Sequence, residues 1–216
     1  MGIQQRLSVR LERFAGSLLH AKKLEVEPAH EPPPKRASEV SVLEHDREEL
    51  TASNALDARG VTVVKSVADS MHALFEVGAE AADGFSTGKA PGISLVEYLH
   101  RVARYVNVWR GHAGGVESAG VRAVVIALIY MERLHARGYL VNANNVHRLA
   151  MTGALLGIKE TEDYPIHNEF WCKVVGVPAK EVCALEIAFC SLLKFELFVA
   201  ASLYARTLDA NDPPGF

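Results

Sequence analysis

An almost wholly apolar stretch, Leu149 to Ile158, constrains the fold of this chain more than any other feature. Thr152 is the one polar residue among its ten. A helix that is apolar on every side must be surrounded by other elements, and this run is shorter than the roughly 20 residues that span a bilayer. It ends in the charged run KETED at 159–163. We therefore predict a core helix whose charged end emerges at a surface.

Two glycines within this run predict how it packs. Gly153 and Gly157 lie four residues apart and therefore share one helix face. Each costs roughly 1 kcal/mol relative to alanine in a helix, and close approach of a neighbouring helix would compensate for that cost. Asn142 or Asn144 is expected to cap the start of the helix, because a short side-chain oxygen accepts from a free backbone N–H.

Composition limits the function classes. The chain has 216 residues, of which 49% are hydrophobic, enough for one domain of ordinary size plus extensions. A formal charge of −3 gives no overall attraction to a phosphate backbone, which argues against nucleic-acid binding. The three cysteines include no C-x-x-C pair and favour a reducing compartment, so we expect a cytoplasmic or nuclear protein. We find no secretory signal and no transmembrane run.

The first 92 residues divide into three segments. Residues 1–26 form a basic amphipathic segment, in which 1–24 would suit either docking on protein or contact with a membrane. Residues 27–38 hold four prolines and are expected to form a linker. Residues 39–92 form a helical extension, in which Val61 to Ala82 has helical periodicity.

Five helical segments follow within 93–200, and residues 201–216 form a C-terminal tail. Ser94 and Glu97 form a capping box at the start of the first segment. The second spans about 117–138 and ends at Gly138. The apolar helix is the third, HNEFWCKVVG is a short fourth, and Pro178 starts the fifth. No strand pattern interrupts them, so the fold class is all-α: a five-helix bundle around a buried central helix, with additional N-terminal helices.

Glu186 is the anomaly of the fifth helix. The expected core stripe is Val182, Leu185, Phe189, Leu192 and Leu193. On a helical wheel Glu186 falls about 40° from Val182, beside the stripe. A carboxylate in low dielectric costs several kcal/mol unless it is paired, and Lys159 is a candidate partner. The alternative is a glutamate that reaches from the edge of the stripe into water and needs no partner.

A catalytic or metal site finds little support. His167, Cys172, Cys183 and Cys190 could be drawn together, but their spacing matches no zinc pattern. Cys183 and Cys190 are expected to be small core residues. The glycine-rich loop at 111–115 follows a helix and lacks the lysine of a P-loop. We expect no catalytic residue, no metal and no cofactor.

Four motifs follow one another in order between residues 127 and 197. They are ALIYMERL at 127–134 with its Tyr-x-x-Arg-Leu, NNVHRLAMTGALLGIKETED at 144–163, NEFWCKVVG at 168–176, and a final Leu-x-Phe-x-Leu at 193–197. In these motifs, residues 94–199 resemble the cyclin box, most closely that of phosphate-pathway cyclins of the P and U types. The sequence departs from the family at Glu160, where an aromatic residue is usual, and at Glu162, which replaces an aspartate. The first helix also lacks the Met-Arg-Ala-Ile-Leu substrate-docking motif.

The resemblance implies a regulatory subunit, without catalysis of its own, that binds a cyclin-dependent protein kinase, activates it, and meets protein substrates through it. In the family, a lysine that ends the third helix and a glutamate on the fifth contact the kinase together. The implied kinase-binding residues are Lys159, Glu162, Asp163, Asn168, Phe170, Lys173 and Glu186, with Trp171 assigned to the core. The role would lie in the cell cycle or in nutrient signalling. The alternative is a cyclin-fold interaction protein or membrane-associated scaffold that activates no kinase.

Overall fold

The computed structural model describes residues 56–76, 83–111, 114–163 and 166–212. These ranges contain seven helices: α3 (Ala58–Ala73), α4 (Leu95–Arg110), α5 (Ala119–Ala136), α6 (Val146–Thr161), α7 (Asn168–Val175), α8 (Ala179–Leu192) and α9 (Ala201–Asn211). The β-structure in these ranges consists of two isolated bridges, Leu56 with Gly114 and Phe75 with Val141. The all-α prediction is confirmed. The predicted segments 1–26 and 27–38, and the start of 39–92, lie outside the described residues.

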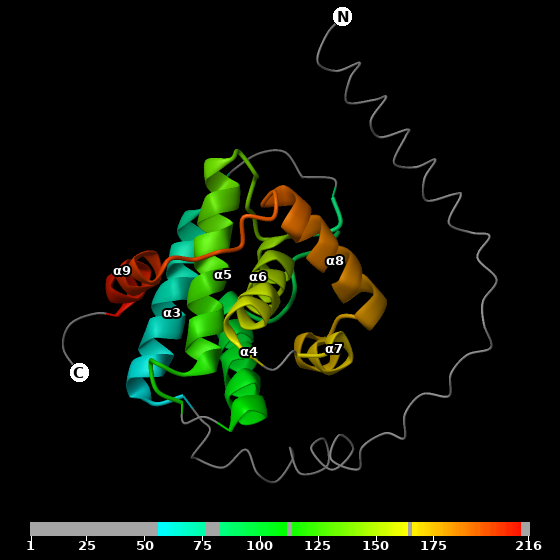
Figure 1. The fold of residues 1–216 in the computed structure, drawn as a ribbon. Helices are drawn as coiled ribbons and strands as arrows, with labels where there is room; N and C mark the ends of the chain where they lie inside the picture. The colour runs from blue at the N-terminus through cyan, green and yellow to red at the C-terminus, as the bar shows by residue number, and fades with distance from the viewer. Residues whose placement is uncertain (1–55, 77–82, 112–113, 164–165, 213–216) are drawn as a thin grey trace, which may run out of the picture. The chain divides into compact units, whose positions relative to one another are not determined.

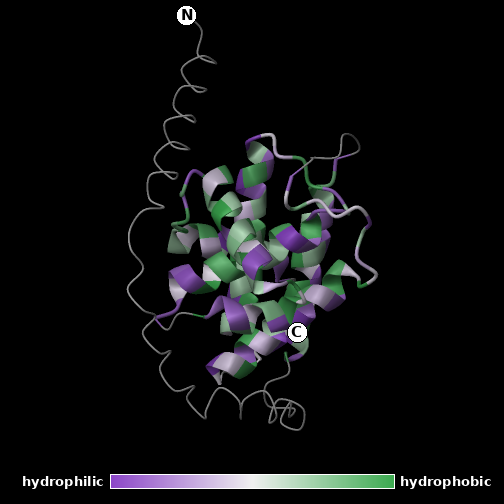
Figure 2. Ribbon diagram, turned by 90° about the vertical axis from the view of Figure 1, so that its right-hand side faces the viewer, coloured by the Kyte–Doolittle hydropathy of each residue, from purple (hydrophilic) through white to green (hydrophobic). Residues whose placement is uncertain are grey.

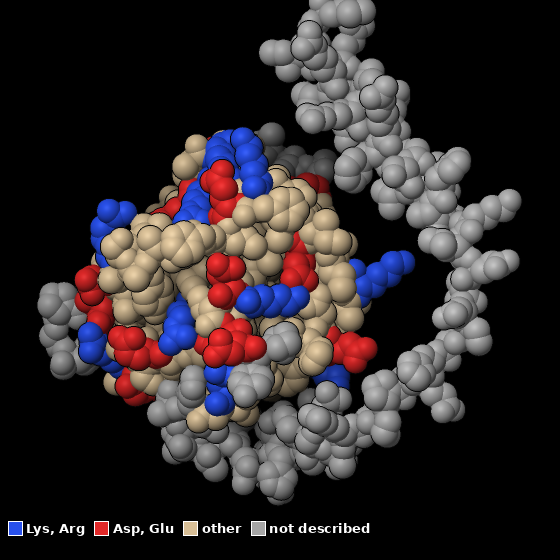
Figure 3. Space-filling model, viewed as in Figure 1, with Lys and Arg blue, Asp and Glu red and all other residues tan. Residues whose placement is uncertain are grey.

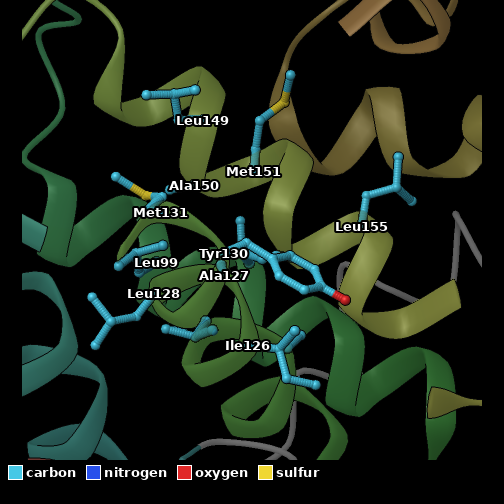
Figure 4. Close-up of a cluster of buried hydrophobic side chains, with 14 of the residues drawn as sticks. Leu99, Ile126, Ala127, Leu128, Tyr130, Met131, Leu149, Ala150, Met151 and Leu155 are labelled. Atoms are coloured by element: carbon cyan, nitrogen blue, oxygen red, sulfur yellow. The ribbon is translucent and has the colours of Figure 1, made fainter. Parts of the chain in front are cut away.

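Two helices, α5 and α6, share the centre of the bundle (Figure 1). The apolar run of α6 is buried as predicted, and its charged end emerges at Lys159 and Glu160. However, α5 is equally central, since it packs against α3, α4, α6 and α9, whereas α6 packs against α4, α5 and α8. Figure 4 shows buried side chains of both helices in one cluster, among them Tyr130 and Met131 from α5 and Ala150 and Met151 from α6. The core is therefore built on a pair of helices.

The two α6 glycines allow α5 to approach closely. A Cβ atom on Gly153 would lie 3.1 Å from the Cα of Ala127, and one on Gly157 would lie 2.9 Å from the Cγ2 of Ile126. The expected compensation for helical glycine is thus confirmed. Gly120 of α5 makes a tighter approach to α4, because a Cβ there would lie 2.1 Å from the backbone oxygen of Ala103.

Helix caps agree with the sequence in one case and differ in another. The Ser94–Glu97 capping box of α4 is present. The prediction that Asn142 or Asn144 caps α6 is wrong: Asn145 holds the cap position and makes no side-chain cap bond. Its amide instead accepts from the N–H of Asn142 and donates to the carbonyl of Leu140. The asparagines therefore stabilise the turn before the helix, a use that short polar side chains share with capping.

Two helices differ from the segments expected for them. Residues Val61 to Ala82 were predicted to be helical, but α3 begins at Ala58, capped by Asp57, and ends at Ala73. The expected tail at 201–216 contains α9, which packs on α3 and α5. Asn211 fixes it there, since its carbonyl oxygen accepts from the hydroxyls of Ser66 and Ser70. The position of α9 is therefore set by contacts with residues far away in the sequence, which the local sequence pattern does not reveal.

The helix α8 lies at the edge of the bundle, where it contacts α6 and α7 (Figure 1). Figure 2, in which this side faces the viewer, shows both hydrophilic and hydrophobic residues on it. Its buried side chains are Val182, Leu185 and Phe189. The prediction of a core position is wrong for Cys183, which is exposed, and only partly right for Cys190, which is half-buried. Leu192 is also exposed. The buried face of α8 is therefore narrower than the apolar stripe that the sequence predicts.

Candidate partner-binding site

Three polar side chains from three helices meet where α6 ends. The ammonium of Lys159 lies 2.5 Å from Oε1 of Glu186 on α8 and donates to Oδ1 of Asn168 on α7 at 2.9 Å. The Asn168 amide in turn donates to Oε2 of Glu186 at 3.0 Å. The anomalous Glu186 therefore has the partner expected for it. We call these three residues the polar triad.

The polar triad remains accessible. Its lysine and glutamate side chains keep 30% and 19% of their surface exposed. Lys159 has three donor hydrogens and uses two of them within the described residues. The short helix α7 holds Asn168 in place because its Trp171 is fully buried, as predicted. The triad is thus a fixed and partly wet arrangement with donor capacity left for a partner.

Glu162 points elsewhere, into a second ionic cluster. Its two carboxylate oxygens lie 2.7 Å from Arg110 on α4 and 2.9 Å from Arg122 on α5, and its side chain is only 5% exposed. We call this group the arginine clamp. The geometry does not support a direct partner contact by Glu162, because both of its oxygens already tie α6 to neighbouring helices.

The other three predicted contact residues are not part of the polar triad. Asp163 is exposed just beyond α6. Lys173 is exposed on α7, where its backbone carbonyl accepts from Arg101 at 3.4 Å. Phe170 is half-buried and packs against the core. The structure thus brings together Lys159, Asn168 and Glu186 of the seven predicted residues.

Sequence reasoning missed the exposed apolar side chains on α8 and in the segment that follows it. Ile187 follows Glu186 directly and is 67% exposed, while Phe195 and Phe198, just beyond α8, are 70% and 74% exposed. Figure 3 shows this face: charged side chains lie beside the largely uncharged surface of the segment between α8 and α9. Phe195 had been noted only as part of the Leu-x-Phe-x-Leu motif. Its neighbours Lys194 and Glu196 are the signal that could have indicated a surface position.

Other kinds of site find no support within the described part of the chain. No helix there is long and apolar enough to cross a membrane. No group of three or more His, Cys, Asp or Glu side chains there is arranged to hold a metal ion.

Comparison with known proteins identifies the family. A family model of the cyclin domain matches residues 36–197, which include α3 to α8. Cyclin-U1-1 of Arabidopsis thaliana is 27% identical over 163 residues, covering 71% of this chain and 72% of the relative. Cyclin-U2-1 of the same plant is 29% identical over 122 residues (56% and 50%), and cyclin-P2-1 of Oryza sativa subsp. japonica is 32% identical over 127 (58% and 54%). The chain spans about half the length of most of the curated relatives it matches. The expected likeness to P- and U-type proteins is confirmed, and the chain belongs to the cyclin family.

Proposed function

We propose that this cyclin is a regulatory subunit that binds a cyclin-dependent protein kinase and activates it. The observation that carries the proposal is the polar triad: a lysine and a glutamate that are paired, held by a third helix, and still partly exposed. A pair at the surface contributes only about 0–1 kcal/mol to folding. Three helices that converge to hold it are better explained by recognition of a partner.

The triad fits the backbone of a partner helix or loop. The remaining donor hydrogen of Lys159 can bond a carbonyl, and the carboxylate of Glu186 can accept a backbone N–H. Charge-assisted bonds of this kind are roughly twice as strong as neutral ones. Ile187 follows Glu186 directly and Phe195 lies just beyond α8, and these exposed side chains would supply the apolar contact that polar groups alone lack.

Activation follows from preferential binding. A protein kinase transfers phosphate only when its strand lysine pairs with a helix glutamate and its activation segment is in place. A cyclin that binds this arrangement more tightly than the inactive one shifts the population towards it. In this mechanism the cyclin does not contact the phosphate that is transferred. Its whole contribution is that it binds the active arrangement of the kinase more tightly than the inactive one.

The test begins with identification of the kinase. The tagged chain is used to isolate a cyclin-dependent kinase from native extract, and that kinase is then prepared recombinantly. Its affinity for the purified cyclin and its activity on a peptide substrate are measured with and without the cyclin. Lys159→Ala and Glu186→Ala should each weaken binding roughly tenfold or more, because each leaves the other charge unpaired at an interface.

Lys65→Ala is the matched control. It removes a lysine from an exposed pair with Asp69 on α3, away from the triad, and should leave affinity unchanged. Equal binding by the wild-type chain and both triad variants would refute the site. Binding without any rise in kinase activity would instead favour the alternative, an interaction scaffold.

A further inference from the structure

The connection between α8 and α9 is extended and runs across α5 (Figure 1). We call residues 194–200 the strap. Leu197 and Val199 pack against the core, and side chains alternate along an extended chain. Phe198 therefore points outward, and Phe195 projects from the turn before it, with 74% and 70% of their surfaces exposed.

Two side chains of α5 hold three consecutive carbonyls of the strap. The guanidinium of Arg133 donates to the carbonyl of Glu196 at 2.7 Å and to that of Phe198 at 2.9 Å. The hydroxyl of Tyr130 donates to the carbonyl between them, that of Leu197, at 2.7 Å. These are the tyrosine and arginine of the Tyr-x-x-Arg-Leu motif, which the polar triad does not use.

The first two residues of the strap have an unfavourable backbone conformation. Lys194 and Phe195 have φ values of 54° and 60°, in the left-handed region that ordinary side chains avoid. Such residues persist only where the surroundings fix them, and they cluster at functional sites. A relaxed connection without these two residues in the left-handed region would carry Phe195 in another direction.

The strap begins two residues beyond α8, the helix that carries Glu186. The N–H of Phe195 donates to the carbonyl of Cys190 at 2.8 Å, and Cys190 lies one helical turn beyond Glu186 on α8. The exposed aromatic rings thus follow directly from the helix that carries the triad's carboxylate.

We propose that Arg133 is a positioning residue for partner binding: together with Tyr130 it fixes the strap so that Phe195 and Phe198 extend the face of the polar triad. This inference rests on the proposed binding of a kinase. Arg133 itself need not touch the partner, because its two bonded carbonyls lie on the strap and its effect is transmitted through the two phenylalanines.

A double-mutant cycle tests this role, with the kinase that the tagged chain isolates from native extract, prepared recombinantly. Arg133→Ala should weaken kinase binding roughly tenfold, as loss of a well-placed aromatic anchor does. In the Phe195→Ala/Phe198→Ala background the same change should cost less than twofold, since nothing remains to position. Arg133→Lys should restore affinity only in part, because an ammonium lacks the planar fork that bonds two carbonyls.

Arg148→Ala is the control for general loss of an arginine contact. Arg148 ties the carbonyl of Gly84 to the carboxylate of Glu181, away from the strap. Its removal should lower the unfolding midpoint yet leave affinity within twofold. The proposal is overturned if Arg133→Ala costs the same factor in both backgrounds, or if Arg148→Ala weakens binding as much. If Lys159→Ala still weakens binding in that case, the proposed function survives; a wild-type chain that binds no kinase would overturn both.

Discussion

Two ionic clusters begin within three residues of each other at the end of α6 and differ in almost everything else. In the arginine clamp, Glu162 is nearly buried and bonded to arginines of α4 and α5. In the polar triad, Lys159 is partly exposed and bonded to side chains of α7 and α8. The clamp joins helices that already share the core, whereas the triad lies where the chain faces water.

The contribution of an ion pair to stability therefore depends on whether the charge that remains after its loss is buried or hydrated. A buried charge that loses its partner destabilises the fold, whereas an exposed charge that loses its partner is hydrated by solvent at little cost in free energy. The clamp therefore belongs to the fold. We expect the partly exposed triad to stabilise the fold little, and we propose that it serves partner recognition. Measurements of stability and of binding should separate the two clusters.

Loss of the clamp carboxylate should have the largest effect. Glu162→Ala leaves Arg110 and Arg122 without the carboxylate that both of them bond, and we expect the free energy of unfolding to fall by about 2–3 kcal/mol. Urea denaturation followed by circular dichroism measures this. Glu160→Ala, two residues away and exposed, should change stability by less than about 0.5 kcal/mol. A loss of stability of similar size in both variants would contradict a special structural role for Glu162.

Loss of the triad charges should matter less for folding. Lys159→Ala and Glu186→Ala should each lower the free energy of unfolding by at most about 1 kcal/mol, the upper end for exposed pairs. The double variant should cost less than the sum of the two singles, because both remove one interaction. A loss as large as that of Glu162→Ala would show that the triad, too, is part of the fold.

The sequence predicted the interior better than the edges. The apolar run of α6, with Gly153 and Gly157 on one face, could be interpreted locally because burial on every side leaves few alternatives. The pairing of Lys159 with Glu186 was also expected, since the wheel placed a carboxylate beside apolar residues and Lys159 at the charged end of the central helix was a candidate partner, which the family resemblance then supported.

The rest depended on contacts between distant segments. Nothing near Glu162 in the sequence indicates that arginines 52 and 40 residues earlier will enclose it. The exposure of Cys183 and Leu192 follows from the position of α8 at the edge of the bundle, and helical periodicity cannot supply that position. The strap, likewise, is shaped by Tyr130 and Arg133 from another helix.

The backbone of the strap offers a smaller test, because two of its residues, Lys194 and Phe195, have left-handed φ values. Lys194→Gly removes the penalty of a left-handed side-chain residue, and the greater freedom of glycine in the unfolded chain offsets part of that gain. We expect a net stabilisation of about 0.5 kcal/mol. Lys65→Gly, within the helix α3, should instead destabilise by about 1 kcal/mol. Thermal unfolding of the two variants side by side measures the difference, and destabilisation by both would contradict a strained turn.

The smallest expected effect is the dependence of stability on pH, which a half-buried histidine of α6, His147, should produce. Nε2 of His147 lies 3.1 Å from the carbonyl of Ile93, and its ring packs on Tyr98. Burial lowers the pKa of His147 below its ordinary 6.5, despite the opposing hydrogen bond to Ile93. The unfolded chain therefore binds a proton that the folded chain refuses, and stability should fall as the pH drops through about 6.5.

His147→Gln should flatten this slope while His100, whose pKa burial also lowers, retains its own share. The measurement is the free energy of unfolding at pH 7.5 and pH 5.5 for wild type and variant. Lys159→Ala, as a triad variant, should keep the wild-type slope, since His147 lies in the first turn of α6 and Lys159 in the last. An unchanged slope in His147→Gln would place the proton uptake on another group.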